Sequence, residues 1–306
     1  MDVALLANQF INGIQLGLIL FLLAAGLSLV FGIMDFINLA HGAFYMIGAY
    51  ICATVAIWTN SYLIGFIAGL PIVFIAGFII ERYLARHLYK RTHLDHVLAT
   101  FGLILCADAG VKFIWGPAGL SVPLPHWLEG KMALGEIVVP NFRAFVVVAA
   151  LVMALALWAV VNRTKAGMLM RAAASNEPMA RALGVETGIV FSLVFSIGAV
   201  LAGIAGMLVA PITGTSIGMG NQIVILALVV IIIGGIGSIR GAFIAALGVG
   251  LIDTLGRAYL STLLALAVSP SMASAAGPAI ASILIYLIMI VVLVVRPAGL
   301  FPPATR

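Results

Sequence analysis

Apolar segments long enough to cross a membrane recur along the whole of this 306-residue chain. They fall at 9–33, 37–58, 62–81, 96–116, 142–161, 188–210, 221–239, 241–260 and 277–295. A helix needs about 20 mostly apolar residues to cross the hydrocarbon core of a bilayer. We therefore predict an all-α protein, a polytopic integral membrane helix bundle with eight or nine transmembrane segments that form a single domain over residues 1–306.

The composition excludes a water-soluble fold. Hydrophobic residues make up 64% of the chain and charged residues 8%, and the mean hydropathy is +1.26. A soluble domain is typically about 25% charged, so this chain requires a lipid bilayer as its second solvent. The net charge of +5 does not indicate nucleic-acid binding, because Lys and Arg in membrane proteins mark the cytoplasmic loops.

Two loops are rich in basic residues, and they predict which side of the membrane each loop faces. One contains Arg82, Arg86, Lys90 and Arg91, and the other, 162–187, contains Arg163, Lys165, Arg171 and Arg181. Placing both in the cytoplasm puts most of the basic residues inside and predicts nine crossings with the N-terminus outside. The glycine-rich stretch 234–241 leaves an alternative, in which 221–240 is a re-entrant segment and the number of crossings changes.

The cytoplasmic loop 162–187 contains the signals of a short helix. Asn176 is a suitable N-cap, Glu177 falls in the first turn, and Pro178 occupies a position whose N–H needs no partner. Gly184 supplies a C-terminal stop. A helix of about eight residues is unstable alone, so we expect it to dock on a partner protein. The alternative is an ordinary basic loop held by lipid headgroups.

Ionisable and polar residues at membrane depth are candidates for a translocation path, because they are costly there and usually face the protein interior or water. Two pairs have the i, i+4 spacing that allows an ion pair on one helix face, and a third set begins the second span. The alternative reading is neutralisation within each pair, and an N-cap role for the asparagine. The candidates are Asp108, Lys112, Asp253, Arg257, Asn38 and His41.

The motifs of several enzyme classes are absent from the sequence. There is no G-x-x-x-x-G-K-[ST] phosphate loop, no H-E-x-x-H and no G-x-S-x-G. The two cysteines, Cys52 and Cys106, lie in apolar segments, where buried thiols without metal or redox chemistry are expected. We therefore predict a non-enzymatic subunit without a cofactor of its own. If transport uses ATP, separate subunits must bind ATP and Mg²⁺.

Several stretches of the sequence resemble the permease subunits of branched-chain amino acid ABC importers, of the LivH type. They are FGIMDFINLAHGAF (31–44), VLATFGLIL (97–105), RTKAGMLMRAAASNEPMARALGV (163–185), AGMLVAPITGTSIGMG (205–220), GGIGSIRGAF (234–243) and RPAGLF (296–301). The resemblance implies that 171–184, including Arg171 and Ala173, is the ATPase-coupling segment. One departure is that Ile217 and Gly218 stand where the family often has proline, in a loop predicted to face outward.

The resemblance also implies a set of partners: a second homologous permease, two cytoplasmic ATPase subunits and a periplasmic or extracellular solute-binding protein. It places the chain in the bacterial inner membrane as a multi-pass subunit that works by alternating access. Related permeases carry urea, short amides or aromatic acids, so the cargo stays open at this point. A stand-alone secondary transporter or channel is the alternative of another class.

Overall fold

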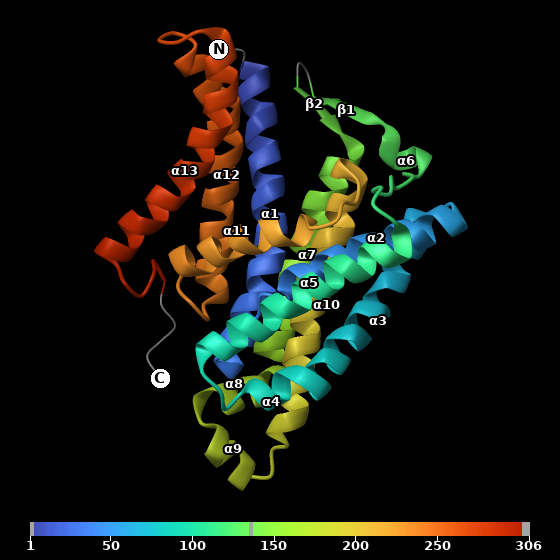
Figure 1. Ribbon diagram of the computed structural model, residues 1–306, viewed down its shortest axis with the longest axis vertical. Helices are drawn as coiled ribbons and strands as arrows, with labels where there is room; N and C mark the ends of the chain where they lie inside the picture. The colour runs from blue at the N-terminus through green and yellow to red at the C-terminus, as the bar shows by residue number, and fades with distance from the viewer. Residues whose placement is uncertain (1–2, 135–136, 302–306) are drawn as a thin grey trace.

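The computed structural model describes residues 3–134 and 137–301, which form a bundle of helices with one small hairpin (Figure 1). The predicted helical membrane bundle is confirmed. The elements are α1 (Val3–Met34), α2 (His41–Thr59), α3 (Tyr62–Ile80), the π-helical turn η1 (Glu81–Ala85), α4 (Arg86–Leu88), α5 (His93–Trp115), α6 (His126–Glu129), β1 (Lys131–Leu134), β2 (Ile137–Pro140), α7 (Asn141–Arg163), α8 (Lys165–Ser175), α9 (Glu177–Ala182), α10 (Thr187–Thr213), α11 (Met219–Gly234), α12 (Ile239–Leu264) and α13 (Pro270–Val295).

Eight helices of the described chain are long and apolar enough to cross a membrane. They correspond to eight of the nine predicted spans. The ninth, α11, has 16 residues and is about 24 Å long at 1.5 Å per residue, less than the ~30 Å hydrocarbon core. Figure 1 shows α11 lying across α1 and α12. The described residues therefore contain eight full-length spans, the lower of the two predicted numbers, and agree with the alternative in which 221–240 is not a full-length span. The helix is bounded by Gly218 and Gly235, both with positive φ.

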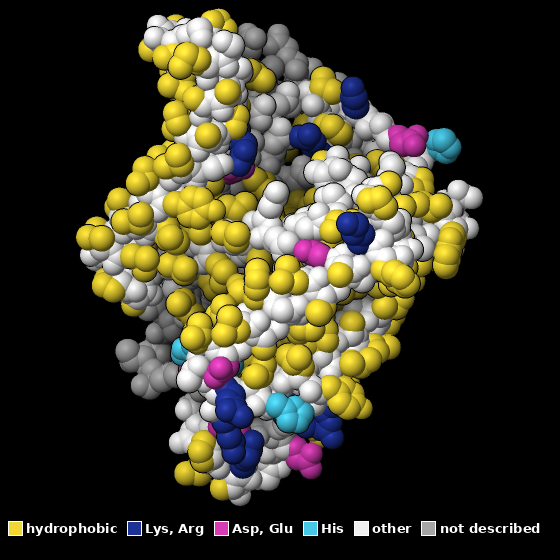
Figure 2. All heavy atoms as spheres, viewed as in Figure 1, with side chains coloured by type: hydrophobic (Ala, Val, Ile, Leu, Met, Phe, Trp, Pro, Cys, Tyr) yellow, Lys and Arg dark blue, Asp and Glu magenta, His cyan; other side chains and the backbone are white. Residues whose placement is uncertain are grey.

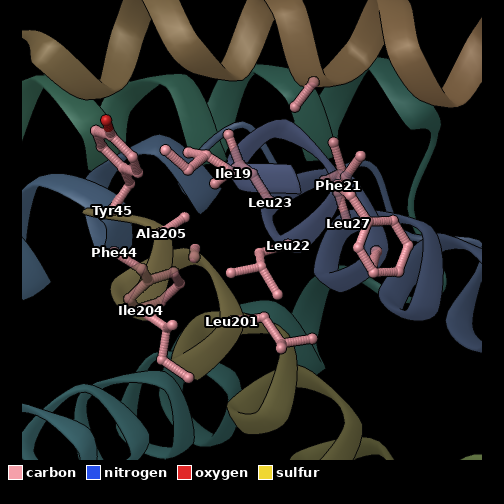
Figure 3. Packing of buried hydrophobic residues seen from close by; sticks show 14 of the residues in the cluster. Ile19, Phe21, Leu22, Leu23, Leu27, Phe44, Tyr45, Leu201, Ile204 and Ala205 are labelled. Carbon is pink, nitrogen blue, oxygen red and sulfur yellow. The ribbon is translucent and has the colours of Figure 1, made fainter. Parts of the chain in front are cut away.

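The centre of the bundle is built from α1, α2 and α10, which are buried along most of their length. Figure 3 shows Leu22 of α1, Phe44 of α2 and Leu201 of α10 directed into one cluster. The helices α3, α5, α7 and α13 instead expose most of their apolar side chains. Such side chains suit contact with lipid or with another apolar helix surface, which explains why the hydrophobic segments show no polar face.

Close helix contacts in the centre use small residues. At the crossing of α2 and α10, a Cβ added to Gly48 would lie 2.6 Å from the Cα of Gly203. Only glycine allows the two backbones to approach so closely, and this approach maximises van der Waals contact where no hydrophobic effect drives helices together in lipid.

The two basic loops lie at the same end of the bundle, as the charge pattern predicts. Nη2 of Arg86, after η1, donates to the carbonyl oxygen of Gly188 at the start of α10, and α8 and α9 lie beside α4 at this end (Figure 1). The described start of α1 lies at the opposite end. We call the end that carries α4, α8 and α9 the basic end.

The backbone pairings outside the helices include a strand pair and a contact near the C-terminus. Strands β1 and β2 are antiparallel, with Lys131 opposite Pro140, so the predicted all-α fold contains one small hairpin in the proline-rich connection before α7. Near the C-terminus, the amides of Leu300 and Phe301 donate to the carbonyls of Ile233 and Gly234 at 2.9 and 3.0 Å. This second pairing supplies donors to carbonyls at the end of α11, which the helix leaves unpaired.

Candidate functional site

The short helix predicted in the loop 162–187 is present as α9. Oδ1 of Asn176 accepts a hydrogen bond from the amide of Met179 at 2.9 Å, and Pro178 occupies the first turn. Gly184 has φ +86, and the amides of Gly184 and Val185 donate to the carbonyls of Arg181 and Ala180. These two bonds form a Schellman motif, which requires the left-handed backbone that glycine adopts readily. The helix has six residues instead of about eight, and it follows a separate helix, α8.

Side-chain contacts fix α9 to the start of α10. Arg181 pairs with Glu177 at 2.6 Å, and its Nε donates to Oγ1 of Thr187 at 2.7 Å. Thr187 is the first residue of α10 and is buried. These contacts join α9 directly to the first residue of a core helix.

The residues of the coupling segment divide into an inner and an outer set. Ala173 on α8 is buried against the bundle, whereas Arg171 is exposed and donates to the carbonyl of Val161 at the end of α7. Met179 and Leu183 are 57% and 77% exposed. The outer surface of α9 thus presents two exposed apolar side chains.

The surface of the molecule shows the same division of charge. Hydrophobic side chains cover most of the face seen in Figure 2, and basic side chains gather at the basic end. Near the middle of this face, an acidic and a basic side chain stand over α5, within the hydrophobic surface (Figure 2). The only two charged residues in the second half of α5 are Asp108 and Lys112.

Asp108 does not form the ion pair predicted for it. Its Oδ2 accepts a hydrogen bond from Nδ2 of Asn221 at 2.9 Å, and within the described residues no ion pair joins it to Lys112, which is exposed. The i, i+4 spacing permits the pair, but α11 brings a closer partner across from another helix. Sequence reasoning missed Asn221, because only the tertiary fold places the first turn of α11 beside α5.

The start of α11 also meets the start of α2. A Cβ on Gly42 would lie 2.4 Å from the carbonyl oxygen of Gly220, so the turn that follows His41 touches the turn that precedes Asn221. Tyr50, further along α2, is fully buried in a cluster with Val111 and Met219, and its hydroxyl lacks a hydrogen-bond partner in the described structure. The α2, α5 and α11 contributions therefore form one polar region within apolar surroundings.

Asn38 and His41 are buried, and neither acts as the predicted N-cap. The N-cap of α2 is Ala40, without a side-chain hydrogen bond. Nε2 of His41 lies 3.1 Å from the carbonyl oxygen of Leu23 on α1. In the described chain, Oδ1 of Asn38 and Nδ1 of His41 lack partners. Both side chains lie in the core, and the His41 ring faces α1.

Asp253 and Arg257 form the predicted i, i+4 ion pair. Both carboxylate oxygens of Asp253 accept from Nε of Arg257 at 2.9 Å, and Nη2 of Arg257 donates to Oγ of Ser282 on α13 at 3.0 Å. The carboxylate is almost buried, whereas the guanidinium is about half exposed. The pair lies between α12 and α13, so the structure does not join it to the Asp108–Asn221 pair.

A polar hollow lies toward the end opposite the basic end. It has a volume of about 210 Å³ and lies between α1, β2 and α7. Arg143 on α7 donates to Oδ1 of Asn12 on α1 at its wall, and Asn8 lies one turn away. Placing the two basic loops in the cytoplasm leaves Arg143 among the basic residues predicted to lie at the outer end. No group of His, Cys, Asp and Glu side chains in the described ranges has the arrangement of a metal site.

The two cysteines differ in their surroundings. Cys52 on α2 is buried, as predicted. Cys106 on α5 is exposed, so the prediction that both are buried is wrong for this residue. The reason is that α5 packs on the bundle through the face that carries His96, Thr100, Ile104 and Val111, and Cys106 falls on another face.

Comparison with known proteins places this arrangement in a family. A model of the family described as branched-chain amino acid transport system / permease component matches residues 9–293. The chain is 30% identical to the high-affinity branched-chain amino acid transport system permease protein LivH of Salmonella typhimurium, over 96% of this chain and 94% of that protein.

Two further relatives carry the same kind of description. BraD of Pseudomonas aeruginosa is 29% identical over 81% of this chain and 85% of its own length. LivM of Escherichia coli is 29% identical over 76% of this chain and 60% of its own length. Both are described as permease proteins of high-affinity branched-chain amino acid transport systems. No solved structure matches the chain.

The apolar helices, the charged helices at one end and the polar residues at membrane depth define a multi-pass membrane permease. The chain belongs to the family of branched-chain amino acid transport system permease components. Its relatives are transport proteins and not enzymes, in agreement with the missing catalytic motifs.

Proposed function

We propose that the chain is the transmembrane permease subunit of an ATP-driven ABC importer for branched-chain amino acids in the bacterial inner membrane. Its partners are a second homologous permease, two cytoplasmic ATPase subunits that bind ATP and Mg²⁺, and an external solute-binding protein. The names of LivH and BraD support the cargo. The relationship to both LivH and LivM supports a pair of homologous permeases, because these are two permease proteins of one kind of transport system.

The observation that carries the ATP-driven mechanism is the construction of α9. A six-residue helix capped at both ends does not persist alone, yet here its position is fixed by Thr187 on α10, and Met179 and Leu183 are exposed on its outer surface. Exposed apolar side chains on a short capped helix suit an apolar groove on a cytoplasmic subunit. The segment 171–184, within the single domain 1–306, is the proposed coupling segment.

Alternating access then follows from a difference in affinity between two states. ATP binding closes the ATPase dimer, and the closed dimer binds one position of α9 better than the other. The motion passes through Arg181 and Thr187 into α10, which forms part of the core with α1 and α2. When these helices shift, the central path closes on one side of the membrane and opens on the other.

The proposed path is lined by the polar residues at membrane depth. Asp108 and Asn221 supply a carboxylate and an amide, and Lys112 supplies a cation on the same helix as Asp108. Arg257, paired with Asp253 between α12 and α13, is a separate candidate for the path. An amino acid zwitterion needs both charges matched, and its aliphatic side chain needs the apolar surface that dominates α5 and α13. Asn38, His41 and Asp253 complete the set, and the hollow at Arg143 lies toward the side from which substrate arrives.

The test is uptake by the reconstituted complex. Proteoliposomes that contain the chain, its second permease and the ATPase subunits should accumulate labelled leucine only with the loaded binding protein outside and ATP inside. Transport by the chain alone without ATPase would refute the importer and indicate a secondary transporter or channel. Uptake of urea, amides or aromatic acids in place of leucine would refute the cargo and retain the mechanism.

A further inference from the structure

A fully buried carboxylate lies at the basic end of the bundle, and neither the coupling segment nor the path includes it. Glu81 is the first residue of the π-helical turn η1, which continues α3, and it has no exposed surface. π-Helical turns are rare and occur often at functional sites. A buried carboxylate is costly unless it is paired and hydrogen-bonded, so its partners indicate what it holds together.

The partners of Glu81 come from two segments. From its own segment, Arg86 donates to both carboxylate oxygens at 3.3 and 3.4 Å, and the Tyr89 hydroxyl donates at 2.7 Å. From α10, Oγ of the buried Ser192 donates to Oε2 of Glu81. Nη2 of Arg86 also donates to Oγ of Ser192 at 2.9 Å and to the carbonyl oxygen of Gly188 at 3.2 Å. The network therefore joins the end of α3 to the first two turns of α10.

The same turns of α10 carry the attachment of α9. Thr187, which accepts from Arg181 of α9, directly precedes Gly188, which accepts from Arg86. The network also extends inward, because the Tyr89 ring contacts Phe36, in the connection between α1 and α2, at a centroid distance of 5.8 Å. It thus lies between the proposed coupling helix and the connection that leads into α2.

We propose that Glu81, Arg86 and Ser192 form a rigid joint, the α3–α10 joint, which makes α3 move together with the cytoplasmic end of α10 when α9 is displaced. The proposal rests on the proposed role of α9 in ATPase coupling. The bidentate contact between Arg86 and Glu81 fixes the orientation of both side chains, and each of them then holds Ser192 of α10 by a hydrogen bond. An apolar contact would hold the two helices together and allow them to slide.

The main test compares ATP hydrolysis with leucine uptake in the reconstituted complex. In the double variant Glu81→Leu/Arg86→Leu, no buried charge is left unpaired, so the fold is retained. We expect the number of ATP molecules hydrolysed per leucine transported to rise about five-fold or more, the lower end of typical coupling between sites. Ser192→Ala, which removes one donor, should raise it in the same direction and to a smaller extent.

Tyr62→Phe is the matched control. The Tyr62 hydroxyl donates to the carbonyl oxygen of Met207 at 3.2 Å, so it is also a buried hydrogen bond between α3 and α10, but at the other end of both helices. Loss of this hydrogen bond should leave the number of ATP molecules hydrolysed per leucine transported unchanged. A double variant that folds and keeps the wild-type ratio would overturn the proposal, as would a Tyr62→Phe variant with an equal increase.

A second measurement tests the joint in the permease alone, so that it does not depend on the importer. Spin labels at Tyr83 and Ile189, both exposed, report the distance between η1 and α10 after Cys52 and Cys106 are replaced by alanine. We expect one narrow distance distribution in the otherwise unchanged chain and a broad one in the double variant. Equal widths would refute the rigid joint. If the unaltered complex shows no ATP-driven uptake, the proposed function fails, whereas the label distances still decide the joint.

Discussion

Removal of the α9 N-cap tests the coupling helix most directly. In Asn176→Ala, the amide of Met179 loses its 2.9 Å bond to Oδ1 of the cap. Loss of an N-cap costs about 1 kcal/mol. The helix has six residues and is not stable by itself, so the loss of the cap should directly increase the local unfolding of α9.

The expected magnitude follows from the local opening equilibrium. A change of about 1 kcal/mol corresponds to roughly a five-fold change in an equilibrium constant. Hydrogen exchange of the permease in detergent should therefore be about five-fold faster at the amides of 179–182. The amides of α12 should be unaffected, because α9 packs mainly on α8 and α10. Uptake by the complex should fall, since a frayed α9 transmits less of the ATPase motion.

Ser175→Ala is the control for this variant. Ser175 is the neighbouring residue, is exposed, and has no side-chain hydrogen bond in the described structure. The amides of 179–182 in this variant should exchange at the same rate as in the unaltered chain. Unchanged exchange in Asn176→Ala would show that the cap does not stabilise α9. Faster exchange with normal uptake would remove α9 from the coupling role.

Three further predictions concern packing, charge and topology. Gly48→Ala should lower the free energy of unfolding of the detergent-solubilised chain by about 1–3 kcal/mol through overpacking. Gly102→Ala, where an added Cβ meets open space, should leave the melting temperature of the chain unchanged or raise it. An equal loss of stability in both variants would contradict the close crossing at Gly48. Arg257→Gln should lower the free energy of unfolding by about 2 kcal/mol, between the values for buried and surface ion pairs. Adding Asp253→Asn should recover part of this free energy in the same melting assay. Additive losses from the two substitutions would contradict the ion pair. A cysteine at Asn176 should react with impermeant reagents only from the cytoplasmic side, and labelling from outside would overturn the assigned sidedness.

The capped helix shows how much of the site the sequence contains. Asn176, Pro178 and Gly184 act within a few residues of one another, and short-range geometry follows from residue type. The same holds for the Asp253–Arg257 pair, which lies one helical turn apart. The apolar segments and the loop charges likewise predicted the helices and the common end of the two basic loops, because burial in lipid and charge asymmetry depend mainly on composition.

Other features depend on which helices meet. Asp108 has two partners within reach, and only the packing of α11 against α5 selects Asn221 over Lys112. The length of α11 was ambiguous, because an apolar stretch bounded by glycines permits either a span or a short transverse helix. Glu81 and Ser192 lie 111 residues apart, and no local sequence pattern predicts their contact. The sequence by itself determined that the chain is a helical membrane protein with a capped helix in a basic loop. The tertiary structure decided the polar contacts between helices, because such a hydrogen bond depends on the relative position of the helices as well as on residue type.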